Sequence, residues 1–480
     1  MVSQNKYRRS PGERRPSGQP LELELQGGAY GGRMVAREQE SGRVIFVQGG
    51  LPGETVRAEL TLEKNRFAEA RAIQVVKPAG GRETPPCVYF GENGHNRGPV
   101  PGGGALPGER GACGGCQYQH LDYDAQLALK RGIVADLMAR QAGLPDLEVG
   151  ETIPSPTPWR YRNRARWIVD DEGRASYHQS ASERLLAVDH CHIVQPLIEE
   201  VLAQLSTEEW RLPLRTLVAE ITARTATPWE EEDDEGEGAR HGPSLLLALH
   251  PRPSAKRRDL RLFAADISEG VRGVDGLIMA PHTDGPGGGL WGYNYFDARF
   301  AGYRYHLSPL TFWQVNEPAA ELLVERVLDQ LGDLSGKSVL DVYAGAGTFT
   351  LPIAGRAAQA LALENDPAAV DDANRSAKAS GLGNVHLLPG DAADELNGLP
   401  RHAADAAVLD PPRAGLHERV VAELVRIEVP RIVYVSCDPA TLARDLRRFA
   451  GNGYAVESVQ PVDLFPQTYH VETIAVLNKL

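Results

Sequence analysis

The chain has 480 residues, of which 42% are hydrophobic and 24% charged, so it is globular and too long for a single hydrophobic core. No stretch approaches the roughly 20 consecutive apolar residues of a membrane-spanning helix, and no apolar segment follows the N-terminus, so we expect a cytoplasmic protein without membrane contact. The net charge is −13, yet residues 1–80 carry 13 Lys and Arg against nine Asp and Glu. The overall charge therefore neither supports nor excludes a nucleic-acid partner.

The N-terminal part predicts a basic tail and a small β-barrel. Residues 1–18 are basic and rich in Pro, Gly and Ser, as in a flexible tail. Within residues 19–80, apolar and polar residues alternate over 21–25, 43–47, 55–60 and 70–76, with glycines between these runs. Period two with such turns predicts the strands of a barrel. The Gly-rich first turn and the turn Leu51-Pro52-Gly53-Glu54 resemble a TRAM domain, a small RNA-binding barrel, and the local basic excess favours phosphate contact over a purely structural role.

Four of the five cysteines predict a metal or cluster site. They are Cys87, the pair Cys113 and Cys116, and Cys191. A C-x-x-C pair separated by glycines lets two thiolates converge, and two further cysteines complete a four-thiolate set. Zinc and a four-iron four-sulfur cluster both accept these ligands, and the spacing does not choose between them. A thioredoxin-like redox pair is a third interpretation, but that pair opens a helix after a strand, whereas Gly-rich sequence precedes this one.

Residues 81–300 are predicted to form a central α+β domain that carries the cysteine site. Helical spacing of apolar residues covers 127–142, and strands are predicted at 244–249 and 273–279. Over 159–167, alternation on a strand would place Arg160, Arg162, Arg164 and Arg166 on one face, either to contact RNA or to protect an edge strand. The insertion at 229–241 holds seven acidic residues and one Arg, which predicts a solvated loop.

The last domain, residues 301–480, predicts an α/β fold with a ligand site at one sheet edge. A dinucleotide-binding fingerprint would need a third glycine, but position 350 is Thr. The D-x-x-x-G-x-G pattern that starts at Asp341 instead matches S-adenosylmethionine enzymes, in which the glycines let the backbone approach the amino-acid part of the cofactor. Four further predicted strands lead to Glu364, Asp391, Asp410 and Cys437. The ends of parallel strands meet at the ligand crevice, although a single loop acid is more often a helix cap.

At these motifs the stretch 310–480 resembles the RNA uracil-5-methyltransferase family, which methylates carbon 5 of uridine in transfer or ribosomal RNA. The matching motifs lie at 312–316, 341–348, 410–415, 436–445 and 465–473. The resemblance implies a Rossmann-like class I methyltransferase domain, S-adenosylmethionine as cofactor and an RNA substrate. With the barrel and the cysteines it covers nearly the whole chain. The cysteine set resembles that of the ribosomal-RNA members, which favours a 4Fe-4S cluster over zinc and rRNA over tRNA.

The family pattern also implies the site residues. Cys437 would be the nucleophile and Glu472 the general base, while Asp410 would orient the pyrimidine or the methyl donor. The implied cofactor-binding residues are Gln314, Asp341, Tyr343, Gly345, Gly347, Thr348, Glu364, Asp391 and Asp410, with Glu364 at the ribose hydroxyls and Asp391 at the adenine amino group. The implied cluster ligands are Cys87, Cys113, Cys116 and Cys191.

The chemistry explains why a thiol and a carboxylate are needed. Carbon 5 of uracil is too weak a nucleophile to take a methyl group unaided, and a thiolate that adds to carbon 6 activates it. A base must then remove the carbon 5 proton. Because a free thiol has a pKa of about 8.5, we expect nearby donors to lower the pKa of Cys437. The target base must also leave its stack, which favours loops or unfolded RNA.

Three alternatives remain at this point. RNA cytosine-5 methyltransferases use the same thiol addition but carry a Pro-Cys dipeptide where this chain has Asp410-Pro411-Pro412. Amino-group methylases end the Asp-Pro-Pro motif with an aromatic residue, and Arg413 is not one. An RNA-binding iron–sulfur protein without activity is disfavoured by Cys437 and Glu472. Two features depart from the family pattern, namely the long spacer between Cys87 and Cys113 and the acidic insertion at 229–241. We expect the protein to be a monomer.

Overall fold

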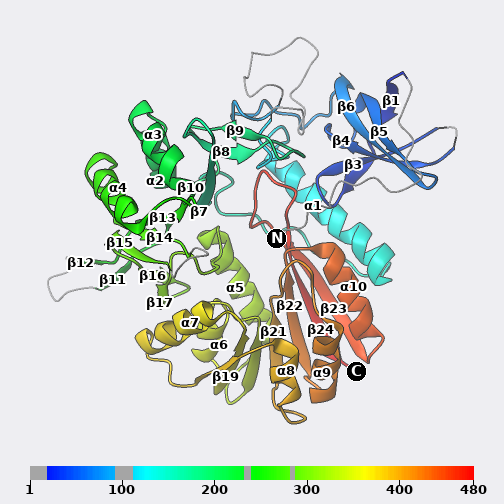
Figure 1. Ribbon diagram of the computed structural model, residues 1–480. Helices are drawn as coiled ribbons and strands as arrows, with labels where there is room; N and C mark the ends of the chain where they lie inside the picture. Colours follow the sequence, from blue (N-terminus) through cyan, green and yellow to red (C-terminus); the bar gives the residue numbers. More distant parts are fainter. Residues whose placement is uncertain (1–18, 40, 92–111, 232–238, 282–286) are drawn as a thin grey trace. The chain divides into compact units, whose positions relative to one another are not determined.

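The computed structural model describes residues 19–39, 41–91, 112–231, 239–281 and 287–480 (Figure 1). The predicted basic tail, most of the long spacer before Cys113 and the middle of the acidic insertion lie outside these residues. The chain forms two compact units. The first unit comprises residues 1–133, 178–186 and 467–469, and the second unit comprises 134–177, 187–466 and 470–480. Across the described residues, no helix has the length and apolarity needed to cross a bilayer.

The first unit contains a six-stranded sheet in the order β1-β5-β6-β4-β3-β2. Its strands are β1 (Leu21–Glu24), β2 (Gly27–Ala29), β3 (Arg33–Arg37), β4 (Val44–Gln48), β5 (Thr55–Glu63) and β6 (Phe67–Lys77). Alternate residues such as Ile45 and Val47 point into a closed core, as period two requires. All four runs predicted from the sequence are strands, which confirms the small β-domain.

A buried carboxylate anchors the turn before β5. Glu54 has no exposed side-chain area, and its Oε1 and Oε2 accept hydrogen bonds from Arg82 Nε at 2.6 Å and Arg82 Nη2 at 2.9 Å. The Leu51 amide donates to Oε2 at 2.9 Å and the Ala79 amide to Oε1 at 3.3 Å. One carboxylate thus joins the turn to the chain that leaves β6.

Removal of this carboxylate should destabilise the first unit strongly. We expect Glu54→Ala to lower its free energy of unfolding by about 3–5 kcal/mol, because Arg82, whose side chain is only 12% exposed, loses its buried carboxylate partner. Denaturant titration of the full chain measures this. Glu59→Ala is the matched control, since Glu59 pairs with Arg71 at the surface with 52% of its side chain exposed, and it should change stability by at most about 0.5 kcal/mol. Equal effects of the two substitutions would contradict the account.

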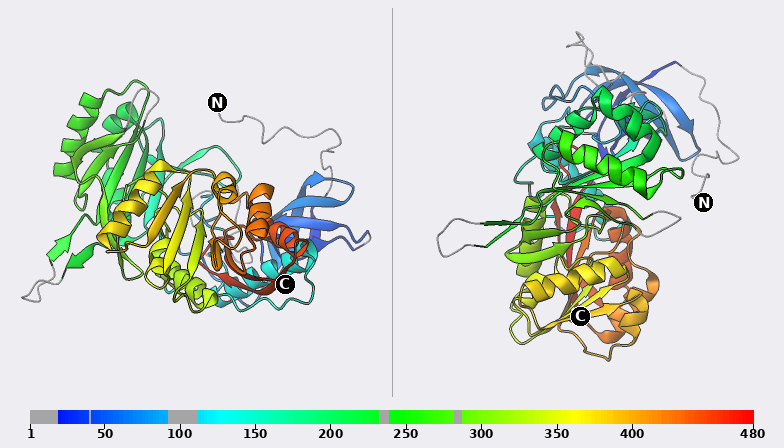
Figure 2. Two further views of the ribbon diagram at one scale, coloured as in Figure 1. Left: turned by 90° about the horizontal axis from the view of Figure 1, so that it is seen from below. Right: turned by 60° about the vertical axis from the view of Figure 1, so that its left-hand side comes forward.

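The central sheet has seven strands in the order β15-β14-β13-β10-β7-β8-β9. The helices α2 (Pro196–Leu205), α3 (Glu208–Leu217) and α4 (Arg257–Gly270) cover one face of this sheet (Figures 1 and 2). The strands are β7 (Arg164–Val169), β8 (Ala175–His178), β9 (Leu185–Ala187), β10 (Val218–Thr225), β13 (Leu245–Pro251), β14 (Gly276–Met279) and β15 (Gly288–Gly292).

The prediction of one basic strand face over 159–167 was wrong. The strand β7 begins only at Arg164, and Arg160 has a φ of +54°, which breaks the alternation. Arg160 forms an ion pair with Glu199 at 3.1 Å, and Arg166 forms one with Glu220 on β10. The positive charge of this segment is therefore partly compensated within the protein.

The described residues of the upstream part also form two short hairpins and two helical segments. The hairpins are β11 (Trp229–Glu231) with β12 (Ala239–His241) and β16 (Phe296–Phe300) with β17 (Tyr303–Leu307). Helix α1 (Tyr123–Leu137) continues into a π-helical turn, η2 (Met138–Ala142), which ends at Gly143 with a φ of +75°.

The C-terminal sheet has seven strands in the order β20-β19-β18-β21-β22-β24-β23. The five strands β18 to β22 pair in parallel, and β24 pairs antiparallel to β22 and β23. The bounds are β18 (Ser338–Val342), β19 (Gln359–Glu364), β20 (Val385–Pro389), β21 (Ala406–Leu409), β22 (Arg431–Ser436), β23 (Tyr454–Val462) and β24 (Glu472–Lys479). All the parallel strands predicted from apolar runs are present.

Helices pack on both faces of this sheet and bury its strands (Figure 1). The helices α8 (Ala392–Asn397), α9 (Glu418–Ile427) and α10 (Pro439–Ala450) cover one face. The helices α5 (Glu317–Leu331) and α6 (Thr350–Ala354), with the hairpin β16–β17, cover the other, and α7 (Pro367–Ala379) packs against β17 and β20. Burial on both faces explains why β18, β21 and β22 read as continuous apolar runs.

Candidate active site

The ends of five neighbouring strands bring the predicted residues to one edge of the C-terminal sheet. Tyr343 follows β18, Glu364 ends β19, and Asp391, Asp410 and Cys437 follow β20, β21 and β22. This is the edge at which open α/β sheets bind ligands.

The antiparallel strand β24 brings the last residue to the same edge. Ser436, the final residue of β22, pairs with Thr473 of β24. The next position along this register joins Cys437 to Glu472, the first residue of β24. Cys437 directly follows β22 and Glu472 begins β24, and the charge of Glu472 raises the pKa of Cys437, so the predicted nucleophile and the predicted base lie close together.

A strained glycine loop follows β18. Tyr343, Gly345 and Gly347 all have positive φ angles, of +70°, +57° and +93°. A non-glycine residue in this region is uncommon and is typical of functional sites. Tyr305 Oη donates to the Gly347 carbonyl at 3.2 Å and fixes the loop from the hairpin side.

Glu364 holds this loop from the next strand. Its Oε2 accepts the Gly345 amide at 2.8 Å, and its Oε1 accepts the amides of Asn365 and Asp366 at 2.7 Å each. A carboxylate offers about four acceptor positions, and backbone amides occupy three of them in Glu364. The carboxylate pre-forms the loop and keeps capacity for a ligand hydroxyl.

Asp341 lies beneath the loop with no exposed area. Its Oδ2 accepts the Thr350 hydroxyl at 2.5 Å, while Oδ1 has no hydrogen-bond partner among the residues that the structure describes. Burial and the charge of Glu364 raise the pKa of Asp341 to about 7, and the Thr350 hydrogen bond opposes this shift. An unsatisfied buried carboxylate oxygen at this edge suits a polar ligand group.

The remaining cofactor candidates are also near this edge. Thr348 lies in the glycine loop and is buried, and Asp391 caps α8 by accepting the Ala393 amide at 2.9 Å. Gln314 is buried, and its backbone carbonyl oxygen accepts a hydrogen bond from Asn163 Nδ2 at 3.0 Å. The central domain therefore fixes the 312–316 motif. The cap role expected for an isolated loop acid is therefore present at Asp391 alongside any ligand role.

Burial and mutual repulsion of negative charge raise the pKa values of the thiol and the carboxylates at this edge. Burial, followed by the charges of Glu472 and Asp410, raises the pKa of Cys437 to about 12, and Arg413 opposes this shift through its charge and a hydrogen bond. Burial and Asp410 raise the pKa of Glu472 well above its usual value. Burial and Asp341 raise the pKa of Asp410 to about 7. The expected low pKa of the thiol was wrong in direction, because burial and then the charges of Glu472 and Asp410 outweigh the effect of Arg413.

Arg413 and His470 belong to this site but were not predicted from the sequence. Arg413 Nη2 lies 2.8 Å from His470 Nδ1, and its guanidinium also hydrogen-bonds Cys437. Arg413 stands in the Asp-Pro-Pro-Arg motif and His470 two residues before Glu472. Each residue lies in one of the family motifs, but 57 residues separate them along the chain. Nothing in the sequence pattern indicated that their side chains are in contact.

The four-thiolate site was not observed. Cys87, Cys113 and Cys116 belong to the first unit and Cys191 to the second unit. In the part of the chain that the structure describes, no three His, Cys, Asp or Glu side chains are arranged to hold a metal ion. Cys113 pairs with Gln179 in an isolated β-bridge, and burial raises the pKa of Cys191. The side-chain geometry therefore gives no support to a metal or cluster.

Comparison with known proteins identifies the family. A family model described as tRNA (Uracil-5-)-methyltransferase matches residues 297–480, and the TRAM domain model matches residues 14–73. An RNA methyltransferase of uncharacterised function from Thermosynechococcus vestitus is 32% identical over 96% of this chain and 98% of its own length. The 23S rRNA (uracil(1939)-C(5))-methyltransferase RlmD of Pseudomonas aeruginosa is 31% identical over 96% of this chain and 95% of its own length. The chain belongs to the RNA uracil-5-methyltransferase family.

A solved structure agrees with the fold. The tRNA (uracil-54, C5)-methyltransferase of Pyrococcus abyssi, solved with S-adenosyl-L-homocysteine, matches 95% of this chain and all of its own chain with a TM-score of 0.67 at 20% identity. The protein is therefore an S-adenosylmethionine-dependent RNA (uracil-5-)-methyltransferase with an N-terminal TRAM domain and an α/β methyltransferase domain.

Replacement of Asp410 should stabilise the protein in a pH-dependent way. The pKa of Asp410 in the folded protein is about 7, above its ordinary value. The folded protein therefore holds this proton more tightly than the unfolded chain does, and the free energy of unfolding falls as pH rises from the ordinary pKa to about 7. We expect Asp410→Asn to raise the free energy of unfolding by about 1–3 kcal/mol near pH 8 and by less near pH 5. Denaturant titrations at both pH values measure this.

The surface residue Asp394 supplies the control. Its carboxylate is 65% exposed and pairs with Arg419, so Asp394→Asn should change stability by at most about 0.5 kcal/mol at either pH. A larger stabilisation by Asp410→Asn at pH 5 than at pH 8 would contradict the electrostatic description.

Proposed function

We propose that Cys437 is the nucleophile, that Glu472 is the general base, and that Arg413 stabilises the thiolate during the reaction. The observation that carries this proposal is the pairing of Ser436 with Thr473, which brings the next residues, Cys437 and Glu472, close enough for the charge of Glu472 to act on the thiol, with Asp410 at the adjacent strand end. The second unit supplies all of these residues, which supports a monomer as the active form.

The proposed reaction proceeds in three steps. The Cys437 thiolate adds to carbon 6 of the uracil, which forms a C–S bond and an enolate. Carbon 5 would then take the methyl group of the donor, whose bond to sulfur breaks so that a neutral thioether leaves. The Glu472 carboxylate accepts the carbon 5 proton, and the C–S bond breaks to return the thiolate. A raised pKa makes the Glu472 carboxylate a stronger base for this step.

S-adenosylmethionine supplies the electrophilic methyl group. The strained loop at Tyr343, Gly345 and Gly347 and the unsatisfied oxygen of Asp341 fit a polar cofactor at this sheet edge. We propose that Thr348 and Gln314 line the same site, that Glu364 binds a ribose hydroxyl and that Asp391 binds the adenine amino group. Asp410 lies between this cofactor region and Cys437 and would orient the pyrimidine.

We propose that the substrate is a uridine of ribosomal RNA equivalent to the one methylated by the relative from P. aeruginosa. The support is 31% identity over nearly the full length of both chains, including the upstream domains. A transfer RNA is the second candidate, because the matching family model and the structure from P. abyssi carry tRNA names.

Substitutions at the two central residues should separate addition from proton removal. Cys437→Ala should reduce methyl transfer by on the order of 10³-fold or more and form no covalent RNA adduct. Glu472→Gln should reduce turnover by about 10²–10⁴-fold and accumulate an adduct that survives a denaturing gel, because the amide cannot take the proton. Both variants should bind S-adenosylmethionine.

Glu457→Gln is the matched control for the base. Glu457 lies on the neighbouring strand β23 with 47% of its side chain exposed, so its replacement should leave turnover unchanged and accumulate no adduct. Methyl transfer by Cys437→Ala at the rate of the unaltered protein would overturn the proposal.

The RNA class can be read from cells that lack the protein. We expect 5-methyluridine to disappear from one position of 23S rRNA and to persist in bulk tRNA, as measured by mass mapping of nuclease digests. Loss from tRNA with unchanged rRNA would favour the second candidate.

The iron–sulfur cluster remains a proposal that rests on the cysteine pattern and the family resemblance. If the four cysteines bind it, anaerobically purified protein should be brown and hold roughly four iron atoms per chain. Cys116→Ala should lose the iron. Stoichiometric zinc, or no metal in freshly purified protein, would rule the cluster out.

A further inference from the structure

Two segments beside the thiol follow neighbouring strands. The loop 410–417 follows β21 and carries Asp410 and Arg413, while α10 begins two residues after Cys437. Asp438 caps α10, because its Oδ1 accepts the amides of Ala440 and Thr441 at 3.0 Å each. The position of Cys437 is thereby fixed to the start of α10.

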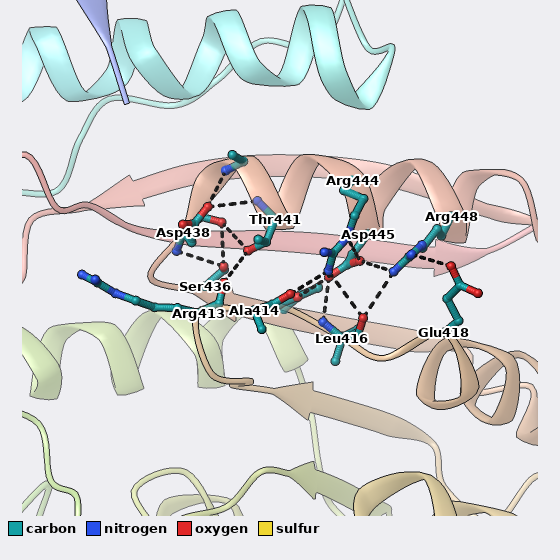
Figure 3. A network of polar contacts seen from close by, with 12 residues as sticks. Arg413, Ala414, Leu416, Glu418, Ser436, Asp438, Thr441, Arg444, Asp445 and Arg448 are labelled. Atoms are coloured by element: carbon teal, nitrogen blue, oxygen red, sulfur yellow. Dashed lines mark hydrogen bonds and ion pairs between the residues drawn. The ribbon is translucent and has the colours of Figure 1, made fainter. Parts of the chain in front are cut away.

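Side chains of α10 bind the backbone of this loop at three residues (Figure 3). We call Thr441, Arg444, Asp445 and Arg448 the α10 clamp. Its contacts are Thr441 Oγ1 to the Arg413 carbonyl (3.2 Å), Arg444 Nη2 to the Ala414 carbonyl (2.9 Å), Arg448 Nη1 to the Leu416 carbonyl (3.3 Å) and the Leu416 amide to Asp445 Oδ2 (2.8 Å). The segment 413–416 of the loop is thus held by one helix.

Asp445 is the centre of the α10 clamp and has no exposed area. Its Oδ1 accepts Arg444 Nε at 2.9 Å and Arg448 Nη1 at 3.0 Å, and its Oδ2 accepts the Tyr434 hydroxyl at 3.0 Å as well as the Leu416 amide. Loss of this carboxylate would leave two guanidinium groups without their shared buried partner. Both arginines would then be free to leave the loop carbonyls.

Gly415 shows how closely the loop approaches the α10 clamp. Its φ is +72°, and an added Cβ would lie 2.5 Å from both Arg444 Nη2 and Asp445 Oδ2. Only glycine permits both this backbone conformation and this approach. The fit of loop to helix is therefore specified in the sequence.

The guanidinium of Arg413 points away from the α10 clamp (Figure 3). It contacts His470 and hydrogen-bonds Cys437, whereas the clamp holds its backbone carbonyl. The place of the guanidinium therefore depends on where the loop backbone is held.

We propose that Asp445 is a positioning residue for the methyl-transfer reaction. It holds the backbone of 413–416 against α10 and thereby keeps the Arg413 guanidinium beside the Cys437 thiol. This inference rests on the proposed role of Cys437 as nucleophile. Without the correct placement of Arg413, the thiolate would face Glu472 and Asp410 with less compensation.

The test measures the thiol directly, without RNA or methyl donor. Full-length protein is alkylated with iodoacetamide over a pH series, and modification of Cys437 is followed by peptide mass spectrometry. We expect Asp445→Asn to shift the alkylation profile to higher pH by about one unit or more, which slows alkylation about tenfold at a given pH below the pKa. Affinity for S-adenosylmethionine should stay within about twofold, because the cofactor loop is not part of the α10 clamp.

Glu418→Gln is the matched control. Glu418, whose side chain is 78% exposed, pairs with Nη2 of Arg448, whereas Asp445 binds Nη1. Its replacement should leave the profile unchanged. An unchanged profile in folded Asp445→Asn would overturn the proposal.

A second variant decides the matter if Asp445→Asn does not fold. Thr441→Val removes the hydroxyl that binds the Arg413 carbonyl, and we expect a smaller shift in the same direction that Thr441→Ser reverses. No shift in Thr441→Val would refute the proposal. If the alkylation profile shifts to higher pH as expected but Glu472→Gln forms no RNA adduct, the role of Cys437 as nucleophile is contradicted. The positioning role of Asp445 would then still stand.

Discussion

The site depends on the antiparallel pairing of β24 with β22, the last of the parallel strands. Because Ser436 pairs with Thr473, Cys437 at the end of β22 and Glu472 at the start of β24 come close together. A thiol and a carboxylate are thereby forced together in a partly buried place, with Asp410 one strand away. The register that buries the surrounding core therefore also sets the backbone positions of the two residues.

This arrangement opposes the resting thiolate. Burial and two carboxylates favour the protonated thiol, so the nucleophile is weak until the environment changes. Arg413 supplies the opposing charge, and the α10 clamp fixes the loop that carries it. The same low-dielectric surroundings raise the proton affinity of Glu472, which suits a base that must remove a proton from carbon. The burial of Cys437 and Glu472 beside each other lowers the free energy of unfolding, as is common for reactive groups at active sites.

Much of the C-terminal domain could be predicted from the sequence. Strands buried on both faces read as short apolar runs, and the residue after each run falls at the ligand edge, so Asp410 and Cys437 could be placed in advance. The strand expected from Arg160 failed because a positive φ interrupts it, which alternation alone does not reveal. The direction of the thiol pKa failed for a related reason. Sequence gives the neighbours along the chain, whereas the burial of the thiol, which raises this pKa most, and the carboxylates that add to it come from other parts of the fold.

The covalent step can be tested with RNA whose target uridine carries fluorine at carbon 5. Addition of Cys437 and methyl transfer would proceed, but fluorine cannot be removed as a proton is, so the C–S bond should persist. After nuclease and protease digestion, the account predicts one peptide that contains Cys437 bound to a methylated 5-fluorouridine adduct. A methylated product released without any bond to Cys437, or an adduct on another residue, would contradict it.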